Sequence, residues 1–170
     1  IHVPLIFRGL DLPKKKRIKG FVQSVDILPT LMEMLAIQKT EVIDGKSLIP
    51  LIRGEIDTLR SFVFVEEGYA ERKRAIRTER YKYIQALSEK DVLCNLCKLV
   101  HGGIEELYDL KKDPLETQNV FKENPELTNV IRKQLSTIVK SSKERRKKKK
   151  YVWPKEEEDI KERLRRLGYI

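Results

Sequence analysis

The sequence predicts an α+β fold, in which a small antiparallel sheet packs against one helix and follows a segment with a strand and an amphipathic helix. Short stretches of β-branched and aromatic residues succeed one another between residues 62 and 110, with no helical pattern between them. Such a succession is typical of antiparallel strands. A helical apolar stripe then begins after Asn124-Pro125, which fit a helix cap and a first helical position.

The first part of the chain predicts one strand and one helix. Val3–Phe7 is a short apolar, partly β-branched run, and this favours a buried parallel strand. A helix is expected from Asp26, as its cap, to about Ala36. One apolar stripe at helical spacing supports it: Leu28, Leu31, Met32 and Leu35. Because a parallel strand needs neighbours on both sides, we expect residues 1–54 to depend on sequence outside this chain.

Four strands are expected after a turn at Asp44-Gly45 and an apolar stretch at Leu48–Ile52. The two middle ones flank Glu79-Arg80 and predict a hairpin. The strands are Phe62–Val65, Ala75–Thr78, Tyr81–Ile84 and Glu106–Leu110. Arg77 and Lys82 are expected on the strand surface.

The predicted second helix has five apolar residues in its stripe: Leu127, Val130, Ile131, Leu135 and Ile138. Beyond Val139 the stripe stops, and the basic residues that follow favour either a solvated helical extension or a linker. A last helix is expected after Pro154, because acidic residues at its start and basic residues at its end suit the helix dipole. We expect this helix to dock through Trp153, Leu164, Leu167 and Tyr169.

The net charge of +10 is concentrated in two clusters. One is Lys14–Lys19; the other, Lys140–Lys150, holds eight basic residues and one acid. The rest of the chain is near neutral. The second cluster is a candidate for polyanion binding, through Lys143, Arg145, Arg146, Lys147, Lys148, Lys149 and Lys150. A solvated tail is the alternative, and stacking on single-stranded bases is not expected because no aromatic residues interleave the basic ones.

The two cysteines form one pair, Cys94-Asn95-Leu96-Cys97, and three interpretations stay open. They are ordinary loop thiols, a disulfide or redox pair, or half of a zinc site. His101 is the only further ligand nearby, and a fourth is not obvious. The sequence alone therefore predicts no metal site.

Several blocks, in this order, carry a resemblance to the C-terminal third of sulfatases in the alkaline phosphatase superfamily. Departures are the Cys94–Gly103 segment and the Lys140–Lys150 run. The blocks that match are Val3–Phe7, Val22–Leu31, Asp44–Leu51, Arg53–Glu55, Ala75–Ile84, Glu106–Leu110, Asp113–Glu116 and Ile160–Ile170.

The resemblance implies four regions. Residues 1–54 would end the large α/β catalytic domain, and residues 61–139 would be the α+β C-terminal subdomain. A basic linker, 140–152, and a C-terminal helix, 153–170, would follow.

Sulfatases resembling this chain use a formylglycine made in a Cys/Ser-x-Pro-x-Arg motif, together with a divalent cation, usually calcium. No such motif occurs in the 170 residues. We therefore expect no catalytic and no metal-binding residue in this chain, and place both upstream, in a missing N-terminal catalytic region. His2 is expected to be a structural residue rather than a contact to sulfate.

The predicted function is that of a C-terminal fragment of a sulfuric ester hydrolase, inactive by itself, whose parent acts on a sulfate ester. Two alternatives stay open: a phosphodiesterase or phosphoglycerol transferase relative of the same superfamily, and a basic polyanion-binding module. No transmembrane run and no signal peptide are visible. The compartment is not determined, although cysteines without an evident disulfide and many lysines lean towards the cytoplasm.

Overall fold

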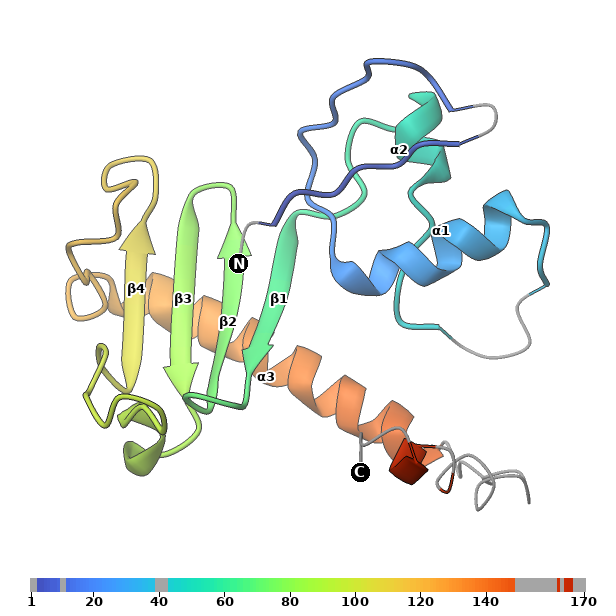
Figure 1. The fold of residues 1–170 in the computed structure, drawn as a ribbon. Helices are drawn as coiled ribbons and strands as arrows, with labels where there is room; N and C mark the ends of the chain where they lie inside the picture. Colours follow the sequence, from blue (N-terminus) through green and yellow to red (C-terminus); the bar gives the residue numbers. More distant parts are fainter. Residues whose placement is uncertain (1–2, 10–11, 39–42, 149–161, 163, 167–170) are drawn as a thin grey trace. The chain divides into compact units, whose positions relative to one another are not determined.

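The computed structural model describes residues 3–9, 12–38, 43–148, 162 and 164–166 (Figure 1). It forms two compact units, residues 1–135 and 136–170, which are considered separately. The elements are η1 (Ser24–Asp26), α1 (Ile27–Met34), α2 (Ile49–Arg53), β1 (Phe62–Glu67), β2 (Lys73–Thr78), β3 (Tyr81–Ala86), η2 (Glu89–Val92), β4 (Glu105–Asp109) and α3 (Pro125–Lys148). None of the described helices is both long and apolar enough to cross a membrane.

The four strands form one antiparallel sheet in the order β1-β2-β3-β4, which confirms the predicted sheet and its hairpin. Register places Ile76 opposite Tyr83 and Tyr83 opposite Leu107, so the three side chains lie in one row on the same face. All three are almost completely buried. This row is the centre of the sheet's core.

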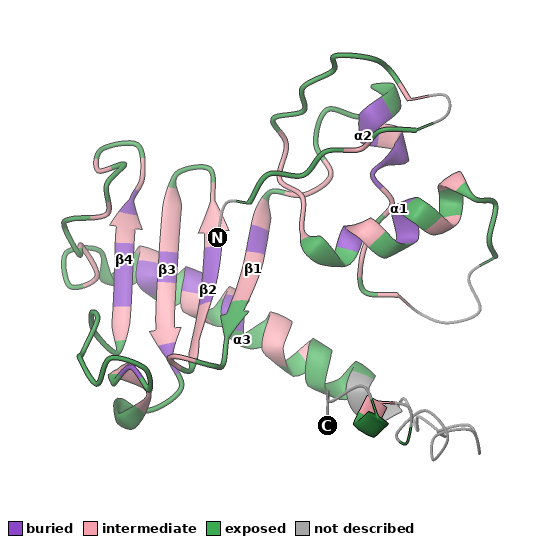
Figure 2. Ribbon diagram, viewed as in Figure 1, coloured by how far each residue is buried: buried purple, intermediate pink, exposed green. Residues whose placement is uncertain are grey.

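The first turns of α3 cover that face, and Figure 2 shows buried residues on both the strands and these turns. α3 begins at Pro125, as predicted, and buries Ile131 and Leu135. Val130 was expected in the stripe but is 64% exposed, because one helical position turns it about 100° away from Ile131. Thr128 is buried instead, and its hydroxyl bonds to Asn124 O at 2.8 Å.

α3 continues through the basic run as far as Lys148. Of the two alternatives for these residues, helix or linker, the described part is helix. In the tail, Glu162 and residues 164–166 are helical, and Arg166 pairs with Glu162 at 2.7 Å, as the spacing predicted. The rest of that helix, including Trp153, Leu167 and Tyr169, lies outside the described residues, as does His2.

The segment before the sheet has a small hydrophobic core of its own. Leu48, Ile49 and Ile52 are its buried members. Gly54, at φ +84°, ends α2 in the left-handed conformation, where a side chain would be strained. The ammonium of Lys16 donates to Ile52 O at 2.7 Å, so the first basic cluster helps to close this helix.

One expectation for this segment is wrong and another agrees with the structure. Val3–Phe7 forms no strand, and Val3 and Ile6 are 75% and 87% exposed, because no strand of the described residues lies beside it. α1 forms where predicted, and its apolar stripe is exposed, as expected for a segment that depends on sequence outside this chain. Leu28, Leu31 and Leu35 are exposed, whereas Pro29 and Thr30 are buried.

Candidate functional site

The sheet and helices position three groups of polar side chains that bear on function: a buried carboxylate at the start of α1, the basic run in α3, and a thiol and imidazole cluster between β3 and β4. Among the described residues, only the last brings three or more side chains of metal-binding type within reach of one ion.

Asp26 is the buried carboxylate, with no exposed surface. It stands at the residue before α1, but its side chain makes no bond to that helix, so the predicted cap of α1 is wrong. Its oxygens accept hydrogen bonds from Gln23 N at 2.8 Å and Lys46 N at 2.9 Å, and they pair with the guanidinium of Arg60. The backbone of Asp26 is already helical, with ψ −16°, and the carboxylate turns towards these partners instead.

Neighbours of Asp26 extend the network to the sheet. The Gln23 side chain donates to Phe64 O in β1 at 2.7 Å and also accepts from Arg60. Gly45 lets its own segment pack directly against the backbone of Val25, since a Cβ at residue 45 would lie 1.8 Å from Val25 O. The carboxylate is thus surrounded by donors from three parts of the chain and is a structural tie.

The basic candidates lie in or beyond the last part of α3. Lys143 and Arg145 are exposed on the helix, and Arg146–Lys148 continue it. Lys149 and Lys150 lie outside the described residues. Polyanion binding through this run stays a prediction.

Of the two strand residues expected on the surface, Lys82 is largely covered. Its side chain is 16% exposed and pairs with Glu116. Arg77 is half-buried. Neither residue belongs to a cluster that suggests catalysis.

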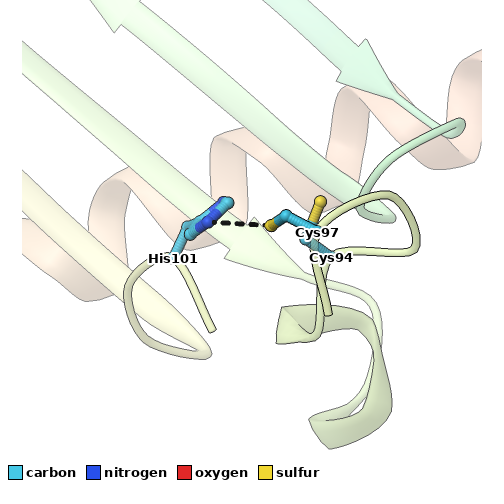
Figure 3. Close-up of side chains that lie close together, drawn as sticks. All are labelled: Cys94, Cys97 and His101. Atoms are coloured by element: carbon cyan, nitrogen blue, oxygen red, sulfur yellow. Dashed lines mark hydrogen bonds between the residues drawn. The ribbon is translucent and has the colours of Figure 1, made fainter. Parts of the chain in front are cut away.

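Cys94 and Cys97 are both free thiols, the first buried and the second exposed. Cys97 Sγ lies 3.2 Å from Nε2 of His101, a contact marked by the dashed line in Figure 3. The other imidazole nitrogen, Nδ1, lies 3.0 Å from Oε1 of Glu71. Backbone N–H groups of Cys97 and Leu96 bond to the Cys94 sulfur and lower the pKa of that thiol.

The sequence singled out the two cysteines and His101, but it missed Glu71. No local pattern marks Glu71, which follows β1 in the connection to β2 and reaches the cluster only because the sheet brings that connection beside the β3–β4 loop. Arg60 was missed for the same reason, since its partner Asp26 is 34 residues away.

Comparison with known proteins identifies the family. The model of the family described as "N-sulphoglucosamine sulphohydrolase, C-terminal" matches residues 1–145. The chain belongs to this family of C-terminal sulfatase domains. It is 31% identical over 139 residues to the Delta 4,5-hexuronate-2-O-sulfatase of Bacteroides thetaiotaomicron, an alignment that covers 76% of this chain and 26% of the relative.

Solved structures agree on the fold. One, described as being in complex with its substrate D-glucosamine-2-N,6-O-disulfate, has a TM-score of 0.54 and 25% identity over 70% of this chain and 24% of its own. The phosphonate monoester hydrolase of Agrobacterium radiobacter has a TM-score of 0.55 at 23% identity, covering 73% of this chain and 26% of its own, and supports the fold alone. The fold is that of the alkaline phosphatase superfamily, and the chain spans about a quarter of the length of these proteins.

Proposed function

We propose that this chain serves as the C-terminal domain of a sulfuric ester hydrolase that acts on sulfated carbohydrates. The observation that carries the proposal is the family match across residues 1–145. The substrate class is suggested by the relatives, since one is named as a hexuronate sulfatase and another holds a sulfated glucosamine.

The uncovered apolar surface of the first segment supports a catalytic region as its partner. Leu28, Leu31 and Leu35 are exposed on one side of α1, and Val3 and Ile6 are exposed in the preceding segment. Burying a leucine or isoleucine side chain contributes about 1.5–3 kcal/mol. An α/β catalytic region that supplies strands beside residues 3–7 and side chains over α1 would gain this energy and complete the fold.

The residues present here do not fit the family's catalytic groups. Calcium takes six to eight oxygen ligands, typically carboxylates and carbonyls. The one cluster among the described residues offers two sulfurs and an imidazole. The formylglycine motif is absent from the sequence. We therefore assign the nucleophile and the calcium ligands to residues outside this chain, and derive no step of the reaction from it.

The test begins with the coding sequence upstream of Ile1 and the full protein that it encodes. We expect a Cys/Ser-x-Pro-x-Arg motif there, and release of inorganic sulfate from sulfated saccharides by the purified full protein with calcium. The matched control is the 170-residue chain, which should release none. Hydrolysis of phosphodiesters without any sulfate release, together with an upstream region that lacks the motif, would favour the phosphodiesterase alternative and refute the proposal.

A weak polyanion-binding role is a second proposal, and the helical extension of α3 favours it. Lys143 and Arg145 are exposed there, within a run that contains one acid. Because contacts to phosphate or sulfate groups release counterions, we expect this binding to be sequence-blind and to weaken steeply with salt.

A further inference from the structure

The loop between β3 and β4 brings two thiols and an imidazole together in a way that the sulfatase reaction does not use. We propose that Cys94, Cys97 and His101 bind a zinc ion, with water as the fourth ligand, and that this ion fastens the loop to the sheet. The proposal is independent of the sulfatase function. It concerns only the connection between β3 and β4, and the acidic residue that contacts it.

The loop that carries the three proposed ligands is folded into a tight turn. Leu93 and Val100 form an isolated antiparallel bridge, so the chain reverses between them. Inside this reversal Cys94 N donates to Leu99 O at 2.9 Å, and Lys98 N donates to Cys94 O at 3.0 Å. Lys98 adopts a positive φ of 61°, an unusual conformation for a residue with a side chain. This tight turn places Cys97 on the same side as Cys94.

Separations among the three ligand atoms are close to those that zinc requires. The two sulfurs and the imidazole nitrogen all lie within 4.8 Å of one another. With Zn–S about 2.3 Å and Zn–N about 2.0–2.1 Å, a tetrahedral ion needs about 3.8 Å between sulfurs and about 3.6 Å between sulfur and nitrogen. Cys97 Sγ and His101 Nε2, at 3.2 Å, need only separate slightly. Small side-chain movements therefore suffice.

The Glu71 carboxylate lies where the outer partner of a zinc-binding histidine is usually found, 3.0 Å from His101 Nδ1. In the tautomer that carries its proton on Nδ1, the Nε2 lone pair would be free for the metal on the side of Cys97. Glu71 is itself fixed, because its other oxygen lies 2.6 Å from the ammonium of Lys73 in β2. Lys73 also donates to His101 O at 2.7 Å. The histidine is thus oriented from both its side chain and its backbone.

The donor set selects the kind of metal. Thiolate and imidazole ligands suit zinc, whereas calcium and magnesium take oxygen. Two thiolates would neutralise the charge of Zn²⁺, and Lys73 lies between the carboxylates of Glu71, at 2.6 Å, and Glu106, at 3.6 Å. Cys97 is exposed and the His101 side chain is 53% exposed, which leaves the fourth position open to water. The Cys-x₂-Cys-x₃-His spacing of Cys94, Cys97 and His101 agrees with such a site.

Cobalt titration of the reduced full chain tests the proposal, with the metal itself as probe. We expect one Co²⁺ per chain, a thiolate-to-cobalt charge-transfer band, visible d–d bands of tetrahedral intensity, and displacement of the cobalt by Zn²⁺. Cys97→Ser and His101→Ala should abolish this spectrum. Glu71→Gln should weaken zinc affinity about 10- to 100-fold, as loss of such an outer carboxylate usually does. The matched control is His2→Ala, because His2 is the only other histidine and should have no effect.

Far-ultraviolet circular dichroism of each variant keeps the test decisive, since Cys97 and His101 are exposed and their replacement should leave the fold unchanged. An unaltered cobalt spectrum in His101→Ala would overturn the three-ligand site. Absence of cobalt binding by the reduced, folded chain would also overturn it. A finding that the chain folds only with a Cys94–Cys97 disulfide would do the same.

Discussion

Replacing Asp26 with alanine should remove the tie between the first segment and the sheet. The carboxylate has no exposed surface, and the Arg60 side chain that it pairs with is 14% exposed. Loss of one partner of a buried ion pair leaves the other charge uncompensated and costs about 3–5 kcal/mol. Gln23 N and Lys46 N lose their acceptor as well, at about 1–3 kcal/mol each if they stay buried. These costs overlap, so we expect a loss of about 3–5 kcal/mol.

Asp26→Asn provides a graded comparison. The amide keeps the shape and one acceptor oxygen but lacks the charge, so the loss should be about 1.5–3 kcal/mol, the value of hydrogen bonds to charged groups. Glu55→Ala is the matched control, because Glu55 pairs with Arg53 at 3.9 Å on the surface, where both side chains are more than half exposed. Removing such a pair should change stability by no more than about 1 kcal/mol.

Amide hydrogen exchange, read segment by segment, is the appropriate assay. It separates opening of residues 21–60 from opening of the sheet, which a single unfolding curve would not do. In Asp26→Ala we expect exchange to accelerate across α1 and α2 while β2 and β3 keep their protection. If Asp26→Ala exchanges like Glu55→Ala in α1 and α2, the buried carboxylate does not anchor this segment.

Three further outcomes are expected. Serine at residues 145–150 should abolish retention on heparin at low salt, whereas serine at Lys14, Lys15 and Arg17 should not. Unchanged retention in the first variant would place the binding surface elsewhere. Burial alone would raise the pKa of Glu105, but hydrogen bonds from Arg132 and Tyr83 outweigh it and lower the pKa below its ordinary value. The stability that this carboxylate contributes is therefore present above the ordinary Glu pKa and is lost as the pH falls through the lowered pKa. In urea unfolding, Glu105→Gln should lose less stability on acidification than the unchanged protein does. An equal loss of stability in the two proteins would contradict this. Residues 3–7 should exchange their amide hydrogens faster than β3, and equal protection in a monomeric sample would show that this segment is folded independently.

The sheet and α3 were predictable because their signals are local. Alternation in the strands and the Asn124-Pro125 start of the helix each act within a few residues, and all four strands lie where the sequence placed them. The exposure of the apolar stripe of α1 was expected from the dependence of residues 1–54 on sequence outside this chain, and not from the stripe itself. Its periodicity is correct, but burial depends on what covers the stripe, and no covering surface is encoded at Leu28 or Leu31 themselves.

Side-chain partnerships were harder to predict than elements. Asp26 has the residue type and the position of a helix cap, and only the fold brings Arg60 beside it. Cys94 and Cys97 were visible as a pair, whereas the contribution of Glu71 depends on the arrangement of two loops at the sheet. Spacing along the chain therefore predicts which groups can act, and the fold decides with which partners.

In the described part of the chain, the hydrogen bonds of buried polar side chains limit which of them could bind a metal or transfer a proton. Its buried polar side chains are already committed: Asp26 to Arg60, Glu106 to Gly103 N and Tyr108, and Thr128 to helix carbonyls. Use of one of these groups to bind a metal or to move a proton would break a bond that the fold already has, at a cost of about 1–3 kcal/mol. The Cys94–Cys97–His101 cluster differs in its kind of donors, since two sulfurs and an imidazole lie within 4.8 Å of one another, and zinc would replace the contact between Cys97 Sγ and His101 Nε2 with stronger ones. The proposed sulfatase function and the proposed zinc site therefore rest on different observations, the family match and the loop cluster, and each can fail without the other.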